Sequence, residues 1–382
     1  MSPPSPLIFS GGPPMRDIEI TLSLRSIPRD AWNACFVSEP EDYDYLRAVE
    51  DSALAGFAWR YVLAYENGTL IAAMPAFLTD YALDTTLDGA GKKIASMLRS
   101  IRPGLLTMKL ACLGSPVSEY GLAGFHADVA DAAKPAILAD MALAFEQHAV
   151  AAGYRLLGLK DIPAFQQSFW EPVFAQHGYA STIGLPVAKL PIDFADMDAY
   201  FASLSAGTRK DMRRKWRTAE GLRIEQRRSI DDVLPQVMAL YRSTRARADM
   251  QFEELNAAFF QNILRSINTA FCTLYYEGEE LLAFNLLLQN DTTLLDKFFC
   301  MDAQRGRAHN LYFISWLTNV AHCITHRLSC YQSGQAGYEN KLRLGSTLIP
   351  TRMVFKHQNR FLQRALRLAA PLLAADDIRE AA

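Results

Sequence analysis

The sequence has few of the features that assign a chain quickly to a class. Its six cysteines, at 35, 112, 272, 300, 323 and 330, form no CxxC pair, and most lie in apolar runs, which favours buried, reduced thiols. No uninterrupted apolar run reaches the roughly 18 residues of a membrane-spanning helix. With 39 basic and 41 acidic side chains the net charge is −2, so the overall charge does not call for a nucleic acid or an anionic membrane as partner.

Several catalytic signatures are also missing. His322 and His326 have the spacing of two zinc ligands but lack the glutamate of HExxH and an evident third ligand, so we predict no metal. Ser333 does not lie in a G-x-S-x-G motif, which argues against a serine hydrolase. Residues 1–16 are proline-rich and have neither the cationic nor the apolar region of a secretion signal, so we predict a disordered leader and a cytoplasmic protein. Translation from Met15 is the alternative explanation of this leader.

The 382 residues, 50% of them hydrophobic, exceed the roughly 250–300 residues over which one core usually extends. Two apolar runs, Tyr61–Tyr65 and Thr69–Leu78, flank an Asn-Gly dipeptide and predict an antiparallel hairpin. The stretch "CTLYYEGEELLAFNLLLQ" repeats this pattern later in the chain. We therefore expect an α/β (α+β) protein with an internal duplication and mainly antiparallel sheets. The predicted domains are 17–190 and 229–382, joined by a basic helical bridge at 191–228.

Two further strand and helix predictions concern the ends of the chain. Alternating apolar residues predict a strand over Ile18–Ile27. The segment "NRFLQRALRLAAPLLA" predicts an amphipathic helix, which we expect to pack on the second domain rather than on a membrane.

Three stretches carry a family resemblance: "SIPRDAWNACF" with "AYENGTLIAAMPAFL", then "LSAGTRKDMRRKWRTAEGLRIE", then "CYQSGQAGYENKLRLG". Over roughly residues 18–365 the chain resembles the Fem-type and BioF2-like group of tandem-GNAT acyltransferases. The resemblance implies two GNAT-like domains and transfer of an acyl group, from acyl-CoA or another thioester, to an amine bound between them. Aminoacyl-tRNA as the donor and a non-catalytic glycan- or phosphate-binding protein are the alternatives.

The last stretch contains the candidate reaction centre. Lys341 follows Tyr338 by three residues and shares its helical face. The resemblance implies that Lys341 serves a phosphate or carbonyl of the substrates, with Tyr331 and Tyr338 as proton donors or substrate walls. Asp296 interrupts the apolar run "TLLDKFFC", and burial there would raise its pKa and make it a proton acceptor. A solvated lysine and an outward-facing, paired aspartate are the alternatives.

Two basic segments are the candidate substrate sites. The resemblance implies that the loop before helix Leu311–His326 holds the donor pyrophosphate on backbone N–H groups, although it has a single glycine and departs from the family's spacing; its residues are Arg305, Gly306, Arg307, Ala308, His309 and Asn310. The run Arg209–Arg217 carries six cations, which suit a phosphate-bearing acceptor or a tRNA end. A capping loop and a solvated helix face are the alternatives. The candidate acceptor contacts are Arg213, Arg214, Trp216, Glu119, Tyr120 and Gln335.

Overall fold

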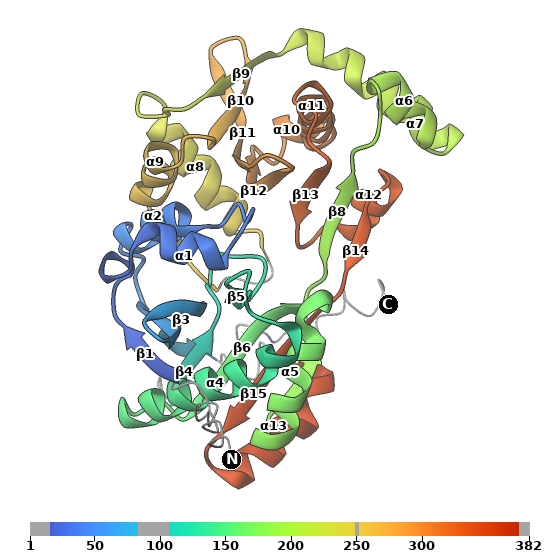
Figure 1. Cartoon of the computed structure of the whole chain (residues 1–382). Coiled ribbons are helices and arrows are strands. Elements are labelled where there is room, and N and C mark those ends of the chain that lie inside the picture. Colours follow the sequence, from blue (N-terminus) through green and yellow to red (C-terminus); the bar gives the residue numbers. More distant parts are fainter. Residues whose placement is uncertain (1–15, 83–106, 249–251, 374–382) are drawn as a thin grey trace, which may run out of the picture.

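The computed structural model describes residues 16–82, 107–248 and 252–373, so the predicted leader lies almost wholly outside the described residues. Two mixed sheets, each flanked by helices, form the lower and upper halves of the molecule in Figure 1. The first sheet has the strand order β1-β2-β3-β4-β6-β15-β7, with β5 paired to β3, and the second has the order β14-β8-β13-β12-β11-β10-β9. The predicted tandem arrangement of mainly antiparallel sheets is confirmed.

The elements up to the crossing into the second sheet are β1 (Arg16–Thr21), η1 (Leu24–Ser26), α1 (Arg29–Cys35), α2 (Tyr43–Asp51), β2 (Phe57–Glu66), β3 (Thr69–Ala82), β4 (Thr107–Leu113), β5 (Gly124–Phe125), η3 (Asp131–Ala133), α4 (Lys134–Ala151), β6 (Leu156–Pro163), α5 (Ala164–His177), β7 (Ala180–Ile183) and β8 (Val187–Pro191). The later elements are α6 (Met197–Ser203), α7 (Ala206–Thr218), η4 (Ala219–Gly221), β9 (Arg223–Arg227), α8 (Leu234–Arg245), α9 (Ala257–Ser266), β10 (Phe271–Glu277), β11 (Glu280–Gln289), β12 (Thr293–Met301), α10 (Arg305–Ala308), α11 (Leu311–Thr325), β13 (Cys330–Gly334), α12 (Tyr338–Arg343), β14 (Thr347–Ile349), β15 (Thr351–His357) and α13 (Arg360–Leu373).

The predicted hairpin is confirmed. Strands β2 and β3 pair antiparallel around Asn67 and Gly68, whose φ angles of 51° and 80° are those of a two-residue turn that twists with the strands. The predicted strand over Ile18–Ile27 is too long. It ends at Thr21, because Ser23 caps a short 3₁₀ turn by accepting a hydrogen bond from the N–H of Arg25.

The two sheets exchange a strand near the middle of the molecule. Strand β8 leaves the first half of the chain and lies in the second sheet between β13 and β14, whereas β15 returns and lies in the first sheet between β6 and β7. Pro186 and Pro350 occupy the two crossings, where a residue without an N–H suits a break in strand pairing. The boundaries at 190 and 229 stay a prediction about folding units, since sheet membership does not divide there and β9 is an edge strand of the second sheet.

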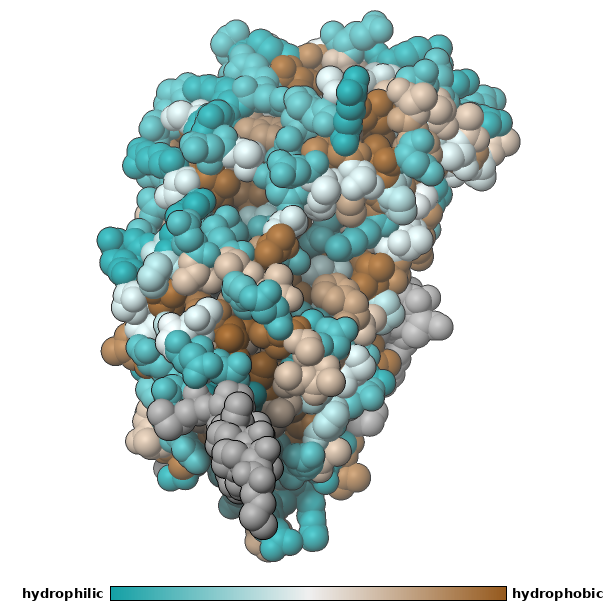
Figure 2. Space-filling view, viewed as in Figure 1, coloured by the Kyte–Doolittle hydropathy of each residue, from teal (hydrophilic) through white to brown (hydrophobic). Residues whose placement is uncertain are grey.

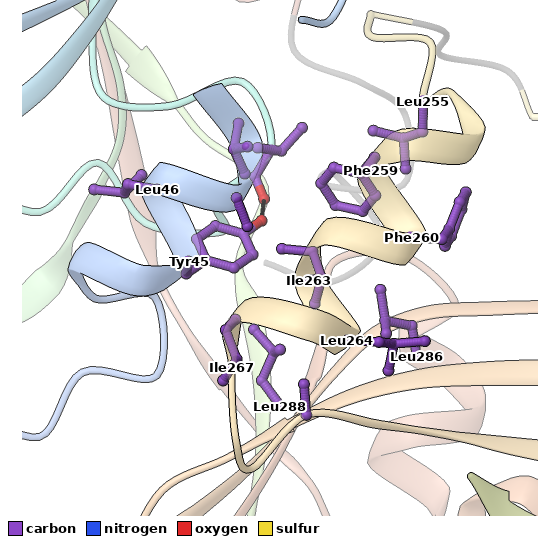
Figure 3. Packing of buried hydrophobic residues seen from close by; sticks show 14 of the residues in the cluster. Tyr45, Leu46, Leu255, Phe259, Phe260, Ile263, Leu264, Ile267, Leu286 and Leu288 are labelled. Carbon is purple, nitrogen blue, oxygen red and sulfur yellow. Dashed lines mark hydrogen bonds between the residues drawn. The ribbon is translucent and has the colours of Figure 1, made fainter. Parts of the chain in front are cut away.

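Helices α2 and α9 join the two halves through a shared apolar core. Tyr45 on α2 and Phe259, Phe260 and Ile263 on α9 are buried in one cluster. Figure 3 shows Tyr45, Phe259 and Ile263 between the two helices and Phe260 on the opposite side of α9. The amide of Asn256 adds a hydrogen bond of 2.7 Å to the carbonyl of Ser52 just after α2. On the face shown in Figure 2, hydrophobic side chains are interspersed among polar ones along the middle of the molecule.

Helix α13 packs on the first sheet rather than on the second, although β15, one of the two strands that it contacts, lies within the predicted domain 229–382. It contacts β15 and β7, two strands of the first sheet, because the strand exchange carries the end of the chain back to the first half. Within the described ranges, no helix is both long and apolar enough to cross a membrane.

Candidate active site

The second sheet opens where its two parallel strands stop pairing. Strands β12 and β13 are in register only from Thr293 to Leu295, opposite Cys330 to Gln332. Just beyond this point, a bulge of β12 in its pairing with β11 leaves Lys297 without a cross-strand partner. Such a bulge changes the direction in which neighbouring side chains point. The predicted catalytic residues lie at this point.

Asp296 is at the centre of a buried polar group. Its carboxylate accepts hydrogen bonds from the hydroxyl of Tyr331 at 2.8 Å, from the amide of Asn285 at 3.0 Å and from the amide of Asn319 at 3.3 Å. Burial raises the pKa of Asp296, while the bonds from Tyr331 and Asn285 and the charge of Lys341 act against that rise. Burial and the Asp296 charge hold the Tyr331 pKa well above its usual range, so this tyrosine is a neutral donor.

Lys341 lies on α12, which begins after the left-handed Gly337. Its buried ammonium donates to the carbonyls of Ser333 and Gly334, the latter at 3.0 Å, and so secures the end of β13. Burial lowers the Lys341 pKa, and the negative charges of Asp296 and Glu119 oppose that shift. The solvated lysine considered as an alternative is therefore wrong, because the side chain is enclosed.

Glu119 reaches this group from the first half of the molecule. It follows β4 in a buried loop, and its carboxylate accepts a 2.5 Å hydrogen bond from the amide of Gln332. Gly334 leaves room for it, since a Cβ at that glycine would lie 2.7 Å from the Glu119 Oε1 atom. Burial raises the Glu119 pKa to about 7, with Lys297 and Lys341 opposing the rise.

The sequence does not single out the cluster next to Glu119. The ammonium of Lys297 donates to the carboxylate of Glu41 at 2.5 Å and to the carbonyl of Val117 at 2.6 Å, a carbonyl that also accepts from Tyr45. These contacts fix the loop that carries Glu119 against β12. They join segments that lie far apart in the sequence, so no local pattern reveals them.

Three further polar residues were missed, and two of them leave a sequence signal. Asn285 and Asn319 are single amides inside apolar runs, which is the pattern of a buried hydrogen-bonding residue. Tyr312, at the start of α11, has a buried hydroxyl with no hydrogen-bond partner among the described residues. That hydroxyl lies 3.5 Å from where a Cβ on Gly337 would be, so it faces the turn before α12. Burial and then the Asp296 charge raise the Tyr312 pKa to about 12.

The other predicted residues of this region surround the group. Tyr338 donates to the carbonyl of Pro186 at 2.9 Å and ties α12 to the crossing before β8. Gln335 donates to the carbonyls of Leu185 and Glu119 at 2.9 and 3.4 Å. Tyr120 lies under the ammonium of Lys189, 5.2 Å from the ring centroid, and its hydroxyl has no partner among the described residues.

The predicted donor loop folds into the short helix α10. The N–H groups of Gln304 and Arg305 bind the Asp302 carboxylate at 3.0 and 2.7 Å. The N–H groups of Gly306, Ala308, His309 and Asn310 bind carbonyls of the same segment. Arg305 pairs with Glu277 and Glu280. The loop's charge and many of its N–H donors are thus already engaged, and pyrophosphate binding there stays a prediction.

The basic helix α7 packs beside α11 rather than at the buried group. Arg213 pairs with Asp198 at 2.8 Å, Arg214 pairs with Asp211 at 2.8 Å, and Trp216 packs on the apolar cluster under the helix. A surface hollow of about 280 Å³ is lined by Gly207, Lys210, Asp211, Arg214 and Arg217. The cationic side chains in this hollow outnumber the acidic ones, as the binding of a phosphate group would require.

The histidine pair has a structural explanation. The rings of His322 and His326 stack 4.0 Å apart, and His322 bonds to Gln289. Burial lowers the His322 pKa to about 4, so this ring is neutral at pH 7. The described part of the chain contains no cluster of three or more His, Cys, Asp or Glu side chains that could hold a metal ion.

Comparisons with known proteins identify the family. A profile of the FemAB-like family, described as peptidoglycan biosynthesis/recognition, matches residues 125–369, more than half of the chain. The structure of FemX superposes with a TM-score of 0.58 over 91% of this chain and 100% of FemX, at 12% identity. The C-terminal domain of an Agrobacterium fabrum protein described as a putative lysylphosphatidylglycerol synthetase superposes with a TM-score of 0.52 over 92% of this chain and 97% of that domain, also at 12% identity.

At these identities the structural matches concern the fold alone. No curated protein matches the chain in sequence. The family match and the two sheets, each with one parallel pair at its centre, agree with the predicted resemblance. The chain belongs to the FemAB-like family and has a fold of two GNAT-like domains.

Proposed function

We propose that this protein is an N-acyltransferase that moves an acyl group from a thioester donor, acyl-CoA in the first instance, to an amine bound where the two halves meet. The observation that carries the proposal is the buried group of Glu119, Asp296 and Lys341. Two acids and a lysine come from both halves and meet at the end of the β12–β13 pairing. Perturbed ionisable groups held together in this way are typical of catalytic sites.

Glu119 is the proposed general base. An amine attacks a thioester only after losing a proton, and a base is most effective when its pKa lies near the working pH. The Glu119 pKa of about 7 meets that condition. Asp296 instead accepts three hydrogen bonds, which hold its carboxyl group in place beside Tyr331, and it interacts with the charge of Lys341.

Lys341 and Tyr312 are the proposed donors to the substrates. Two of the three ammonium donors of Lys341 are engaged by Ser333 and Gly334, which leaves one for the oxygen that becomes negative during attack. The unpartnered hydroxyl of Tyr312 is neutral at pH 7 and can hydrogen-bond to the leaving thiolate. Tyr338 holds α12 in place through Pro186.

The donor can be tested by thermal unfolding with coenzyme A, acetyl-CoA and longer acyl-CoAs. Binding to the native state alone raises stability by about 3 kcal/mol at a concentration of 100 times Kd. Stabilisation by an acyl-CoA, followed by release of free thiol when an amine is added, supports the proposal. Absence of stabilisation by all of these ligands rules out the coenzyme A version.

An aminoacyl ester on tRNA is the second candidate donor, and the cationic hollow on α7 favours it. Lys210 and Arg217 line that hollow beside the Arg214–Asp211 ion pair, whereas the charge of Arg305 in the predicted pyrophosphate loop is neutralised by Glu277 and Glu280. Binding of aminoacyl-tRNA should weaken steeply with salt, and replacing Lys210 and Arg217 by Gln should reduce the slope by about one for each phosphate that is no longer neutralised. An unchanged slope would exclude this role for α7.

A protein that binds neither donor but retains a phosphate or glycan ligand would instead be a non-catalytic binding protein.

A further inference from the structure

Helix α13 is attached to the molecule by polar side chains. Gln363 is buried; it accepts a hydrogen bond from the N–H of His357 at 2.7 Å and donates one to the carbonyl of Gly178 at 3.4 Å. Arg367 donates to the same carbonyl at 2.9 Å. Leu366, one turn after Gln363, is half-buried on the same side. An amphipathic helix of a globular protein normally turns most of its apolar side inward, whereas between Arg360 and Leu368 two of the attaching side chains of α13 are polar.

The opposite face of α13 is apolar and exposed. Phe361 and Leu368 are 80% and 81% exposed, and Leu362 beside them is 46% exposed. Phe361, Ala365 and Leu368 are spaced by four and three residues, so they share one face. Within the described ranges, Phe361 and Leu368 are the most exposed of the large apolar side chains. Their exposure costs free energy in water and points to a partner with an apolar interior.

A strip of positive charge borders this apolar face. Arg360 and Arg364 are exposed, lie one turn apart, and form no ion pair with any residue that the structure describes. The helix contains no acidic residue from Arg360 to Leu373. A helix with aromatic and leucine side chains on one face and arginines beside them has the composition of a helix that lies in the interface of an anionic membrane.

We propose that α13 docks the protein on a lipid surface that carries anionic headgroups, with Phe361 and Leu368 inserted among the acyl chains and Arg360 and Arg364 at the headgroup level. The occupant is identified by charge complementarity, since an uncharged apolar protein surface would leave the arginines without counter-charges. In Figure 1 the helix lies at the end of the molecule that carries the first sheet. It contacts β15 and β7, which contribute no side chain to the Asp296 group, so this inference does not depend on the proposed function.

Vesicle flotation tests the proposal with the full chain. The protein should bind vesicles of phosphatidylcholine containing phosphatidylglycerol, bind pure phosphatidylcholine far less, and dissociate as salt is raised. Changing both Arg360 and Arg364 to Gln should lower the partition coefficient about fivefold for each cation removed. The double variant F361S/L368S should no longer bind. The matched control is L22S/V37S, which removes two apolar side chains that are 63% and 67% exposed elsewhere, and it should bind as the wild type does.

A fluorescent variant provides a second measurement that does not rely on loss of binding. Ala365→Trp places an indole on the apolar face, and its emission should shift to the blue on anionic vesicles only. Two results would overturn the proposal: no binding to anionic vesicles at low salt, or equal binding by F361S/L368S. Concentration-dependent self-association that this double variant abolishes would also overturn it, because a second copy of the chain would then cover the helix.

Discussion

The two halves of the molecule use the same parallel strand pairing in different ways. In the first half, β4 and β6 pair from Leu110 to Leu113 opposite Leu156 to Leu159, and the paired residues are apolar apart from Gly158. The following loop closes this pair, since the N–H of Gly121 bonds to the carbonyl of Asp161 at 3.0 Å. In the second half, β12 and β13 pair over three residues and then give way to buried acids, amides and a tyrosine. The first pairing is closed by backbone hydrogen bonds, whereas the second ends at the polar side chains of the candidate active site.

Lys160 in the first half and Lys341 in the second half show the same difference between the two pairings. Lys160 donates to the carbonyls of Ser115 and Ser118 at 3.2 and 2.7 Å, as Lys341 donates to two carbonyls at the end of β13. Each lysine secures a loop, but only Lys341 interacts with the charges of both Asp296 and Glu119. The loop that Lys160 secures is the one that carries Glu119 into the second half. The first half thus serves as a support that contributes one acid to the site.

The largest expected effect is the loss of that acid. Changing Glu119 to Gln keeps the hydrogen-bonding shape of the side chain but removes the base, so transfer should fall by about 10² to 10⁴-fold. The wild-type rate should rise with pH through about 7 as Glu119 ionises, because the pKa of this carboxyl is raised to about 7, and the variant should lack this rise. The pH dependence of kcat/KM for the two proteins measures this.

The control for Glu119 is Glu339→Gln, which changes an exposed acid on α12, the helix of Lys341. It should retain both the rate and the pH dependence of the wild type. A Glu119→Gln variant that retained the rise near pH 7 would assign that ionisation to another group and remove the proposed base.

The second prediction compares the two lysines. Both Lys341→Met and Lys160→Met leave two backbone carbonyls without a donor, so each should lower the free energy of unfolding by about 1–3 kcal/mol. Only Lys341→Met should also lower kcat, by about 10² to 10³-fold, because it removes a donor to the developing negative oxygen. Urea unfolding and steady-state kinetics on both variants separate the two roles. Equal loss of kcat would mean that Lys341 acts only by holding its loop.

The third prediction concerns the effect of Glu119 on stability. A carboxyl whose pKa rises from 4.5 to about 7 on folding contributes stability that is fully present below pH 4.5 and is lost as the pH rises through about 7. The full loss amounts to at most about 3 kcal/mol, at about 1.36 kcal/mol per unit. Glu119→Gln should therefore be more stable than the wild type at pH 8 and little different at pH 5, as measured by urea unfolding. A constant difference at both pH values would contradict the raised pKa.

Much of this architecture could be predicted from local sequence patterns. The Asn-Gly hairpin, the second hairpin, the basic helix and the short helix of Lys341 all depend on short-range signals, and the structure has each of them. Asp296 is predicted from its place inside an apolar run, where burial would raise its pKa and make it a proton acceptor, and Lys341 and Tyr331 are predicted from the family resemblance. The structure brings these residues and Glu119 together.

The strand exchange and the contacts around Glu119 could not be predicted in the same way. The exchange places Val187 opposite Ile349 and Ala180 opposite Phe355, and the Glu119 contacts join it to Gln332. Nothing in a strand's own pattern says which sheet it joins. The composition of the predicted donor loop likewise did not show that the charge of Arg305 is neutralised. Its partners, Glu277 and Glu280, belong to the turn between β10 and β11, which is not adjacent to the loop in the sequence.

The smallest effect expected concerns two tyrosines of the second half that differ in their partners. The Tyr331 hydroxyl donates to Asp296, so Tyr331→Phe leaves a buried carboxylate one donor short and should cost about 1–3 kcal/mol of stability. The Tyr312 hydroxyl has no partner among the described residues, so Tyr312→Phe should leave the melting temperature unchanged. If Tyr312 bonds to the leaving thiolate, the same variant should lower kcat about tenfold, equivalent to about 1.4 kcal/mol of transition-state stabilisation. An unchanged kcat with unchanged stability would leave this hydroxyl without a role in transfer. Unchanged stability with reduced kcat would place the leaving group between α11 and the Gly337 turn.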